Sequence, residues 1–254
     1  MEDYRLESNI FICKVHFFSY WCTILVSREL IEKARELHGH VCPFLVLGLR
    51  ASEIAMSKLG VSRAGVSESI EEEIVVIVEA NNCMSDGVQV ATGCTLGNNS
   101  LIYMDTGKNA ITIFKRGSRR GIRVYIDAER IRQRYFDPRA TELFRKVVVE
   151  RRGNPDEIEE LDRLWEETGM RMAWIPEEEF VVQEVEITEN LERAPIFESV
   201  RCSGCGELVM APKAVYIDGK PFCASCAERD VPAVVGRGIV TAFRTPFKVI
   251  KRIS

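Results

Sequence analysis

Residues 101–127 read LIYMDTGKNAITIFKRGSRRGIRVYID, and this stretch decides the predicted fold class. Its three apolar runs, 101–104, 110–115 and 121–127, are rich in β-branched and aromatic residues, which is typical of strands. The first connection, Asp105-Thr106-Gly107-Lys108, contains turn-forming residues and predicts a hairpin. Short connections of this kind join antiparallel strands, so the sequence favours an α+β fold over a doubly wound parallel sheet.

More predicted elements lie on both sides of this stretch. Residues 74–78, IVVIV, are typical of a fully buried strand, and 179–187 alternate loosely enough to predict a last strand. Helical periodicity follows Ser27, a good N-cap residue, and again follows Pro43, which suits a first helical turn. Further helices are predicted over 85–92, over about 139–151, and from about 156 onward.

The composition limits the class of protein. The chain has 254 residues, a formal net charge of −4 and 46% hydrophobic residues. It can therefore bury a sizeable core, which excludes a mostly disordered, collagen-like or multi-span membrane protein. The acidic balance also argues against a surface devoted to nucleic acid. We expect an apolar extension over 1–26, a core domain over 27–190, and a C-terminal domain with a basic tail over 191–254.

The N-terminal extension is open to three interpretations. Residues 10–26 are apolar but short for a bilayer span, and Lys14 and His16 interrupt them, so a buried strand or helix is favoured over a membrane anchor. The third hypothesis is that translation starts near Val26. The first residues carry several acids and no basic stretch, so we expect no signal peptide and a cytoplasmic location.

Nine cysteines make a complete set of intramolecular disulfides impossible. Four of them form the pattern C-x2-C-x17-C-x2-C: Cys202, Cys205, Cys223 and Cys226. This spacing is typical of a structural zinc site, in which four thiolates close a tetrahedral shell. The predicted architecture is therefore an α+β core, mainly an antiparallel sheet wrapped by helices, followed by a small four-cysteine zinc finger. Residues 215–220, with Asp218-Gly219, predict a hairpin inside the finger.

A second group of soft ligands lies in the core segment. His38-Gly39-His40-Val41-Cys42-Pro43 places two imidazoles beside a thiol, and Cys42 is predicted at a helix N-cap, where the helix dipole stabilises a thiolate. Cys83 and Cys94 follow in two further polar, glycine-containing segments. Imidazole and thiolate together suit zinc or another transition metal. Free cysteines are also often simply buried, and this alternative stays open for Cys83 and Cys94.

These motifs resemble those of the family named for the E-subunit of formylmethanofuran dehydrogenase. The matching segments are His38–Pro43 with Gly48 and Arg50, then Cys83-Met84-Ser85-Asp86, then residues 89–97 (QVATGCTLG), then Asp105–Lys108, and finally the cysteine quartet. The resemblance implies an α+β core with helices around a sheet, a homodimer, and an association with archaeal or anaerobic molybdenum or tungsten enzymes, including those of methanogenesis. The family name does not imply that this chain itself catalyses the dehydrogenase reaction.

The resemblance also implies which residues form the site. The expected pocket ligands are His38, His40, Cys42, Cys83 and Cys94, supported by Asp86, Gln89 and Thr95. Two departures from the family pattern are Phe44, which stands in place of a glycine, and Asn98-Asn99-Ser100, which lacks the usual lysine. A third is Gly87, which stands where alanine is common.

Three functions follow from the sequence. The leading hypothesis is a metal-binding accessory protein of one-carbon or molybdenum/tungsten metabolism, with a structural Zn²⁺, a second transition metal or small ligand in the pocket, and oxidoreductase subunits as partners. The alternative is a thiol- or metal-dependent enzyme that uses Cys42 as nucleophile with His38 or His40 as base. The third, nucleic-acid binding through the finger and the basic residues of 237–252, is disfavoured by the acidic balance, and no membrane partner is expected.

Overall fold

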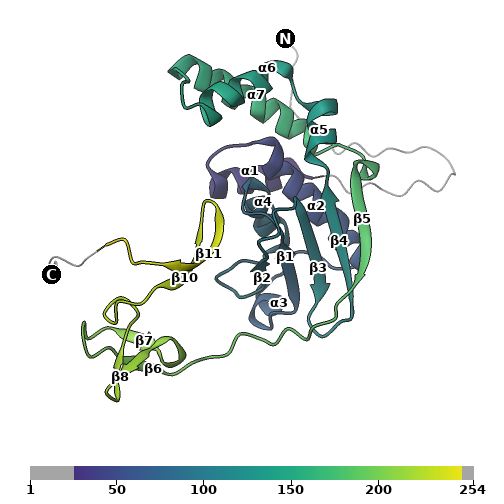
Figure 1. The fold of residues 1–254 in the computed structure, drawn as a ribbon. Helices are drawn as coiled ribbons and strands as arrows, with labels where there is room; N and C mark the ends of the chain where they lie inside the picture. Colours follow the sequence, from purple (N-terminus) through teal and green to yellow (C-terminus); the bar gives the residue numbers. More distant parts are fainter. Residues whose placement is uncertain (1–25, 248–254) are drawn as a thin grey trace, which may run out of the picture.

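The computed structural model describes residues 26–247, which form a core and a C-terminal module (Figure 1). A five-stranded sheet with the order β2-β1-β3-β4-β5 lies at the centre of the core. Its strands are β1 (Ile74–Val78), β2 (Leu101–Tyr103), β3 (Ala110–Lys115), β4 (Arg120–Ile126) and β5 (Phe180–Glu186). Within this sheet β1 and β2 pair in parallel and the other three pairs are antiparallel, so the α+β prediction is confirmed.

The predicted hairpin at 105–108 is wrong, because β1 lies between β2 and β3. The loop instead crosses the end of β1 and bonds to Glu79, the residue after that strand. The Thr106 hydroxyl donates to Glu79 Oε2 at 3.0 Å, and the Lys108 amide donates to the Glu79 carbonyl at 3.2 Å. A buried partner distant in sequence therefore replaced the expected local pairing, whereas the β3–β4 connection is a true hairpin.

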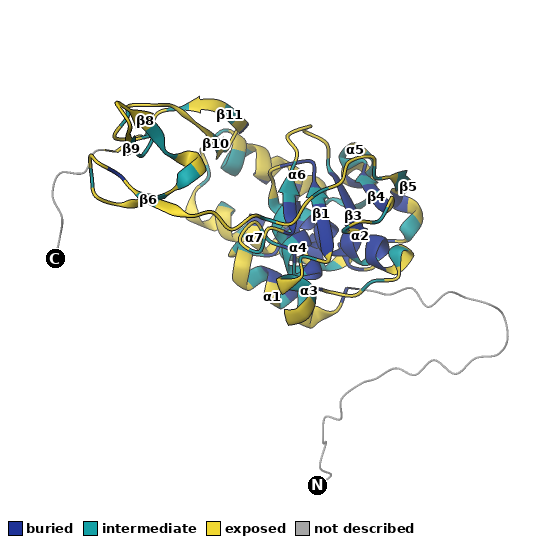
Figure 2. Cartoon of the chain, turned by 90° about the horizontal axis from the view of Figure 1, so that it is seen from below, coloured by how far each residue is buried: buried dark blue, intermediate teal, exposed yellow. Residues whose placement is uncertain are grey.

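Four helices precede or interrupt the strands: α1 (Arg28–His38), α2 (Pro43–Leu59), α3 (Val66–Ile70) and α4 (Cys83–Thr92). The helix α2 is buried along most of its length and contacts β3, β4 and α4 (Figure 2). Its contact with α4 is close, because Gly48 faces the Met84 carbonyl and Gly87 faces the Leu45 carbonyl. This packing brings the N-terminal ends of α2 and α4 together.

A helical lobe follows β4 and consists of α5 (Ala128–Tyr135), α6 (Pro138–Phe144), a π-helical turn (Arg145–Val149) and α7 (Pro155–Met172). The predicted helix over 139–151 is therefore divided, with its second half wound as a π turn. Ala140, Leu143, Leu161 and Leu164 form a small core inside the lobe. The helix α7 also packs on α2, so the lobe is joined to the main core.

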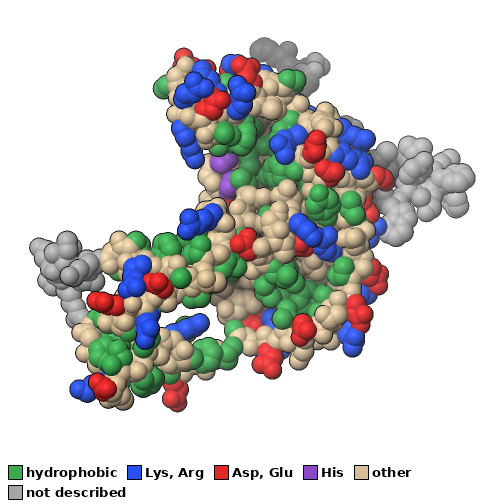
Figure 3. Space-filling model, in the orientation of Figure 1, with side chains coloured by type: hydrophobic (Ala, Val, Ile, Leu, Met, Phe, Trp, Pro, Cys, Tyr) green, Lys and Arg blue, Asp and Glu red, His purple; other side chains and the backbone are tan. Residues whose placement is uncertain are grey.

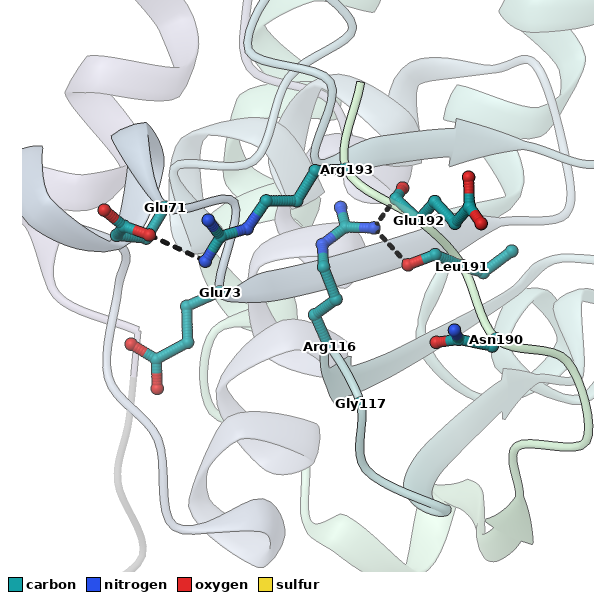
Figure 4. A pocket seen from close by; sticks show the side chains of 8 residues that line it. All are labelled: Glu71, Glu73, Arg116, Gly117, Asn190, Leu191, Glu192 and Arg193. Atoms are coloured by element: carbon teal, nitrogen blue, oxygen red, sulfur yellow. Dashed lines mark hydrogen bonds and ion pairs between the residues drawn. The ribbon is translucent and has the colours of Figure 1, made fainter. Parts of the chain in front are cut away.

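A linker runs from β5 to the C-terminal module, and Arg116 fixes it to the core (Figure 4). Its guanidinium donates to the carbonyls of Leu191 and Glu192, each at 2.6 Å, and pairs with Glu72 at 3.1 Å. Arg193 pairs with Glu71 at 2.6 Å across the same open pocket. These contacts hold the start of the linker against the edge of the core.

The C-terminal module consists of three two-stranded ribbons and one 3-10 turn (Ala211–Lys213). The ribbons are β6 (Ser199–Arg201) with β7 (Leu208–Met210), β8 (Val215–Ile217) with β9 (Lys220–Phe222), and β10 (Val231–Val235) with β11 (Gly238–Phe243). The predicted hairpin at 215–220 is confirmed, and Asp218 and Gly219 both have positive φ at its turn. Within residues 26–247 no helix has the length and apolar character needed to cross a membrane. The predictions for the N-terminal extension, including Cys13 and Cys22, lie outside the described residues.

Candidate functional site

Three chain ends meet at the candidate site of the core. His38 is the last residue of α1, where Gly39 ends the helix with φ +92°. Cys42 is the N-cap of α2, and Cys83 is the first residue of α4. The close packing of α2 on α4 therefore places residues 38–42 beside Cys83, which lies more than forty positions away in the sequence.

The donor atoms of His38, Cys42 and Cys83 lie within 4.8 Å of one another. His38 Nε2 is 4.0 Å from Cys42 Sγ. Its Nδ1 bonds to Asp86 Oδ2 at 2.7 Å, and Gln89 Nε2 donates to the other Asp86 oxygen at 3.2 Å. A carboxylate that holds one imidazole nitrogen directs the other toward a metal, which is the usual outer arrangement of histidine ligands. The predicted supporting residues Asp86 and Gln89 are thus placed next to the ligand group.

The electrostatics of the site assign the thiolate to Cys83. A hydrogen bond from Cys42 lowers the pKa of Cys83 to about 6; burial opposes this shift, and His38 adds to it. Burial lowers the pKa of His38, but its hydrogen bond to Asp86 and the Cys83 charge outweigh burial and raise it overall. The metal-free site therefore contains an imidazolium–thiolate pair near neutral pH.

This result differs from the expectation for Cys42. Although Cys42 is an N-cap, its side chain is 4% exposed and makes no capping hydrogen bond. The hydrogen bond that it gives to Cys83, together with burial, raises the pKa of the Cys42 thiol. A buried thiol that donates to its neighbour is a poor nucleophile, so the helix-dipole argument from sequence selected the wrong cysteine for thiolate character.

Alkylation of the metal-free protein tests this assignment. We expect iodoacetamide to modify Cys83 with a midpoint near the lowered pKa, about 6, and to modify neither Cys42 nor Cys94 at neutral pH. The substitution Cys42→Ala removes the donor and should move the midpoint up toward the ordinary thiol value of about 8.5. Site-resolved mass spectrometry across pH measures both. Preferential labelling of Cys42 in the wild-type protein would contradict the assignment.

His40 lies beside the group rather than in it. Its ring centroid is 4.6 Å from that of His38 and 5.6 Å from the stacked ring of Trp165, which itself lies 5.7 Å from Phe144. Burial and the neighbouring His38 charge lower the pKa of His40, so its imidazole is neutral. Its Nε2 atom is buried and, among the described residues, has no hydrogen-bond partner. His40 thus offers a neutral nitrogen next to the ligand group, and Trp165 continues an aromatic row into α7.

Two predicted residues are not brought to the site. Cys94 is fully buried, and its thiol donates to the Ile74 carbonyl at 3.4 Å, so its place is in the core beneath β1. Thr95 instead organises the next loop, where its hydroxyl accepts from the Asn98 amide and its own amide donates to the Asn98 side chain. The open alternative of a buried, structural cysteine therefore describes the position of Cys94.

Sequence reasoning missed the contribution of α7. Gly169 packs directly on the turn that carries Cys42, because a Cβ at Gly169 would lie 2.9 Å from Val41 Cγ1. Trp165, one turn earlier, was assigned to the apolar stripe of the helix. No sequence signal connects it with His40, since 125 residues separate the two. Figure 3 shows the described histidines in a hollow between the helical lobe and the C-terminal module.

The second candidate metal centre lies in the C-terminal module. The four sulfur atoms of Cys202, Cys205, Cys223 and Cys226 lie within 4.8 Å of one another. Backbone amides of Gly204 and Cys223 point at Cys202 Sγ, at 3.4 and 3.2 Å. Amides directed at sulfur stabilise thiolates, and hydrogen bonds from backbone amides lower the pKa of Cys202 to about 6. A group of four thiol ligands suits a closed, structural zinc site.

Comparison with known proteins matches both parts of the chain. The family described as "FmdE, Molybdenum formylmethanofuran dehydrogenase operon" matches residues 37–182, and the prokaryotic dksA/traR C4-type zinc finger matches 195–231. A solved structure of an FmdE-like protein of tungsten formylmethanofuran dehydrogenase, from Syntrophus aciditrophicus, has a similar fold. It shows a TM-score of 0.51 and 22% identity over 78% of this chain and 90% of that chain.

A curated relative is more similar in sequence. A protein of Archaeoglobus fulgidus described as "Probable S-adenosyl-L-methionine-binding protein" is 56% identical over 212 residues. The match covers 84% of this chain and 56% of the relative, so the chain spans little more than half of that protein's length. The family match over 37–182 covers more than half of the chain and contains the whole His38–Cys42–Cys83 group. The chain therefore belongs to the FmdE family and carries a C-terminal C4-type zinc finger.

Proposed function

We propose that the protein binds a transition metal through His38 Nε2, Cys42 Sγ and Cys83 Sγ, in addition to the structural zinc of its finger. The observation that carries the proposal is the convergence of these three donors within 4.8 Å, with Asp86 holding the other nitrogen of His38. Two thiolates and one imidazole are a donor set that zinc accepts in sites where the fourth position stays open for a ligand.

The chemistry of the donors favours a borderline or soft metal over Mg²⁺ or Ca²⁺, which prefer oxygen ligands. A metal held there supplies a Lewis-acid centre at the base of the hollow that contains the histidines. Cys42 must lose its proton to ligate, so we expect metal binding to release protons and to weaken as the pH falls. Within the proposed role, the protein acts as an accessory of one-carbon or molybdenum/tungsten metabolism, which the family's association supports.

The number of metal ions per chain tests the proposal. We expect anaerobically purified protein supplied with zinc or cobalt to hold two ions, and Cys42→Ser and Cys83→Ser to hold one. Cys94→Ser is the matched control, because Cys94 is a buried core cysteine that lies outside both groups. Elemental analysis gives the stoichiometry. Two ions in Cys83→Ser, or one ion in the wild-type protein, would refute a metal at the core site.

A second candidate is binding of S-adenosylmethionine, which the printed description of the relative suggests for that protein. The observation that favours it here is the aromatic row of His40, Trp165 and Phe144 beside the thiol group. Aromatic faces bind both an adenine ring and a sulfonium cation. The unpartnered His40 Nε2 adds a polar contact inside the same hollow.

Titration with S-adenosylmethionine, followed by calorimetry, distinguishes the two candidates. If the aromatic row forms the site, Trp165→Leu should weaken binding by about tenfold, the loss of roughly 1–2 kcal/mol of ring contact. Trp174→Leu is the control, since Trp174 is 65% exposed and lies outside the aromatic row. No heat of binding by the wild-type protein would eliminate this candidate and leave the metal proposal untouched.

A further inference from the structure

The hairpin of β10 and β11 contacts the core next to the candidate site. Asn81 Nδ2 donates to the Val235 carbonyl at 3.3 Å, at the end of β10. Asn81 precedes Asn82, the N-cap of the helix that begins with Cys83. The Ile239 amide, at the start of β11, donates to Asp105 Oδ2 at 2.7 Å. The tip of the hairpin is thus attached to two core loops, one of which presents Cys83.

The contact at Asp105 is shaped for the hairpin. Gly238 has φ +106°, and a Cβ on it would lie 2.1 Å from Asp105 Oδ2. The Tyr103 hydroxyl donates to the other carboxylate oxygen at 2.6 Å, so both oxygens of Asp105 are occupied. Only glycine permits this approach and this backbone conformation at little cost. The position of the tip is therefore specific rather than a loose surface contact.

The docked loops bring together two cations that have no acidic partner among residues 26–247. Arg237 lies at the tip of the hairpin, between Val235 and Gly238, and Lys108 lies in the loop that begins with Asp105. Both are exposed, and within the described part of the chain neither side chain makes a hydrogen bond or ion pair. Neighbouring arginines differ: Arg123 pairs with Glu79 at 2.7 Å, and Arg244 pairs with Asp230 at 2.6 Å.

The nearby acids are already engaged. Asp105 accepts from Tyr103 and Ile239, and Glu79 accepts from Arg123 and Thr106. The Lys108 charge acts on Glu79 only at longer range. The cap of α4 is neutral, because Asn82 stands there and its side-chain amide donates to the Asn109 side chain at 2.8 Å. The junction thus has two uncommitted cations, an arrangement that favours an oxyanion.

We propose that this junction is an oxyanion-binding site, in which Arg237 and Lys108 hold the carboxylate or phosphate group of a small ligand. The hairpin forms one wall of the hollow, so a ligand anchored there extends toward Cys83 at the start of α4. Only this last step rests on the proposed function; the oxyanion site itself does not need a metal in the core.

Binding of inorganic phosphate and of acetate to the full-length, zinc-loaded protein tests the site and separates the two oxyanion classes. We expect one site per chain, weakened about tenfold by Arg237→Ala and by Lys108→Ala, because each removes a charge-assisted hydrogen bond. Arg237→Lys should restore part of the affinity. Gly238→Ala, which keeps both cations but displaces the tip, should also weaken binding, and calorimetry at constant ionic strength measures all of these.

The control variant is Arg229→Ala, since Arg229 is an exposed cation of the same module outside the docked tip. Equal affinity in Arg229→Ala, Arg237→Ala and wild-type protein would overturn the proposal, as would the absence of binding by both anions. The titration is repeated with Cys83→Ser. Unchanged phosphate affinity in this variant is expected, and it keeps the result independent of whether the core binds a metal.

Discussion

Replacing Cys223 by Ser should remove zinc from the C-terminal module and unfold residues 199–230 while the core stays folded. The three ribbons of the module are short, and of its described apolar residues only Cys202 is fully buried. A segment this small does not fold on a hydrophobic core alone, since below about 40 residues a metal or crosslink is usually needed. Binding of a structural zinc contributes on the order of 10 kcal/mol, so its loss exceeds any stability that the segment retains.

Hydrogen exchange with zinc analysis measures this result. Amides of β6 to β9 should lose their protection in Cys223→Ser, whereas those of β3 and β4 should keep it. Ser225→Ala is the control, because Ser225 lies between the ligands Cys223 and Cys226 and its hydroxyl bonds to Thr245 rather than to a sulfur. A zinc-free variant whose ribbons remain protected would show that the module folds without the metal.

The zinc finger could be predicted from sequence because its signal is local. Two C-x2-C turns and an Asp-Gly hairpin state their own geometry, and the structure places all four sulfurs together. Helix ends were predictable for the same reason: Gly39, Gly60 and Gly93 each adopt the left-handed conformation that ends a helix.

The candidate site was only partly predictable, because it depends on contacts between distant segments. The motif around His38 and Cys42 indicated the ligands, and Cys83 joins them as expected. Spacing could not tell that Cys94 is turned into the core or that β1 separates β2 from β3. The protonation of Cys42 was also beyond the sequence, because it follows from burial and from the neighbouring Cys83, not from the position at a helix N-cap.

Gly87→Ala should destabilise the core by about 3 kcal/mol and also weaken metal binding at the core site. A Cβ at residue 87 would lie 2.1 Å from the Leu45 carbonyl oxygen, a backbone atom that cannot rotate away. Forcing extra atoms into a packed contact typically costs about 1–3 kcal/mol, and a clash with backbone lies at the upper end. Relief requires α4 to move away from α2, and this motion separates Cys83 from Cys42.

The reciprocal contact predicts the same result for Gly48→Ala, whose Cβ would lie 2.2 Å from the Met84 carbonyl oxygen. Gly97→Ala is the control, because its nearest neighbour would be Thr95 Oγ1 at 3.8 Å, an ordinary contact. Thermal unfolding should show a loss of roughly 6–12 °C for the first two variants and little change for the third. Cobalt titration of the folded fraction then reads the core site.

Gly87 is also where this chain departs from the alanine common in the family pattern, so this substitution tests how the site is built. If the close approach of α2 to α4 sets the distance between Cys42 and Cys83, Gly87→Ala must lower metal affinity even at temperatures where the protein is fully folded. Unchanged affinity in a folded variant would mean that the loops around Gly39 and Asn82 position the donors without help from the helix contact. The two helix glycines would then serve stability alone.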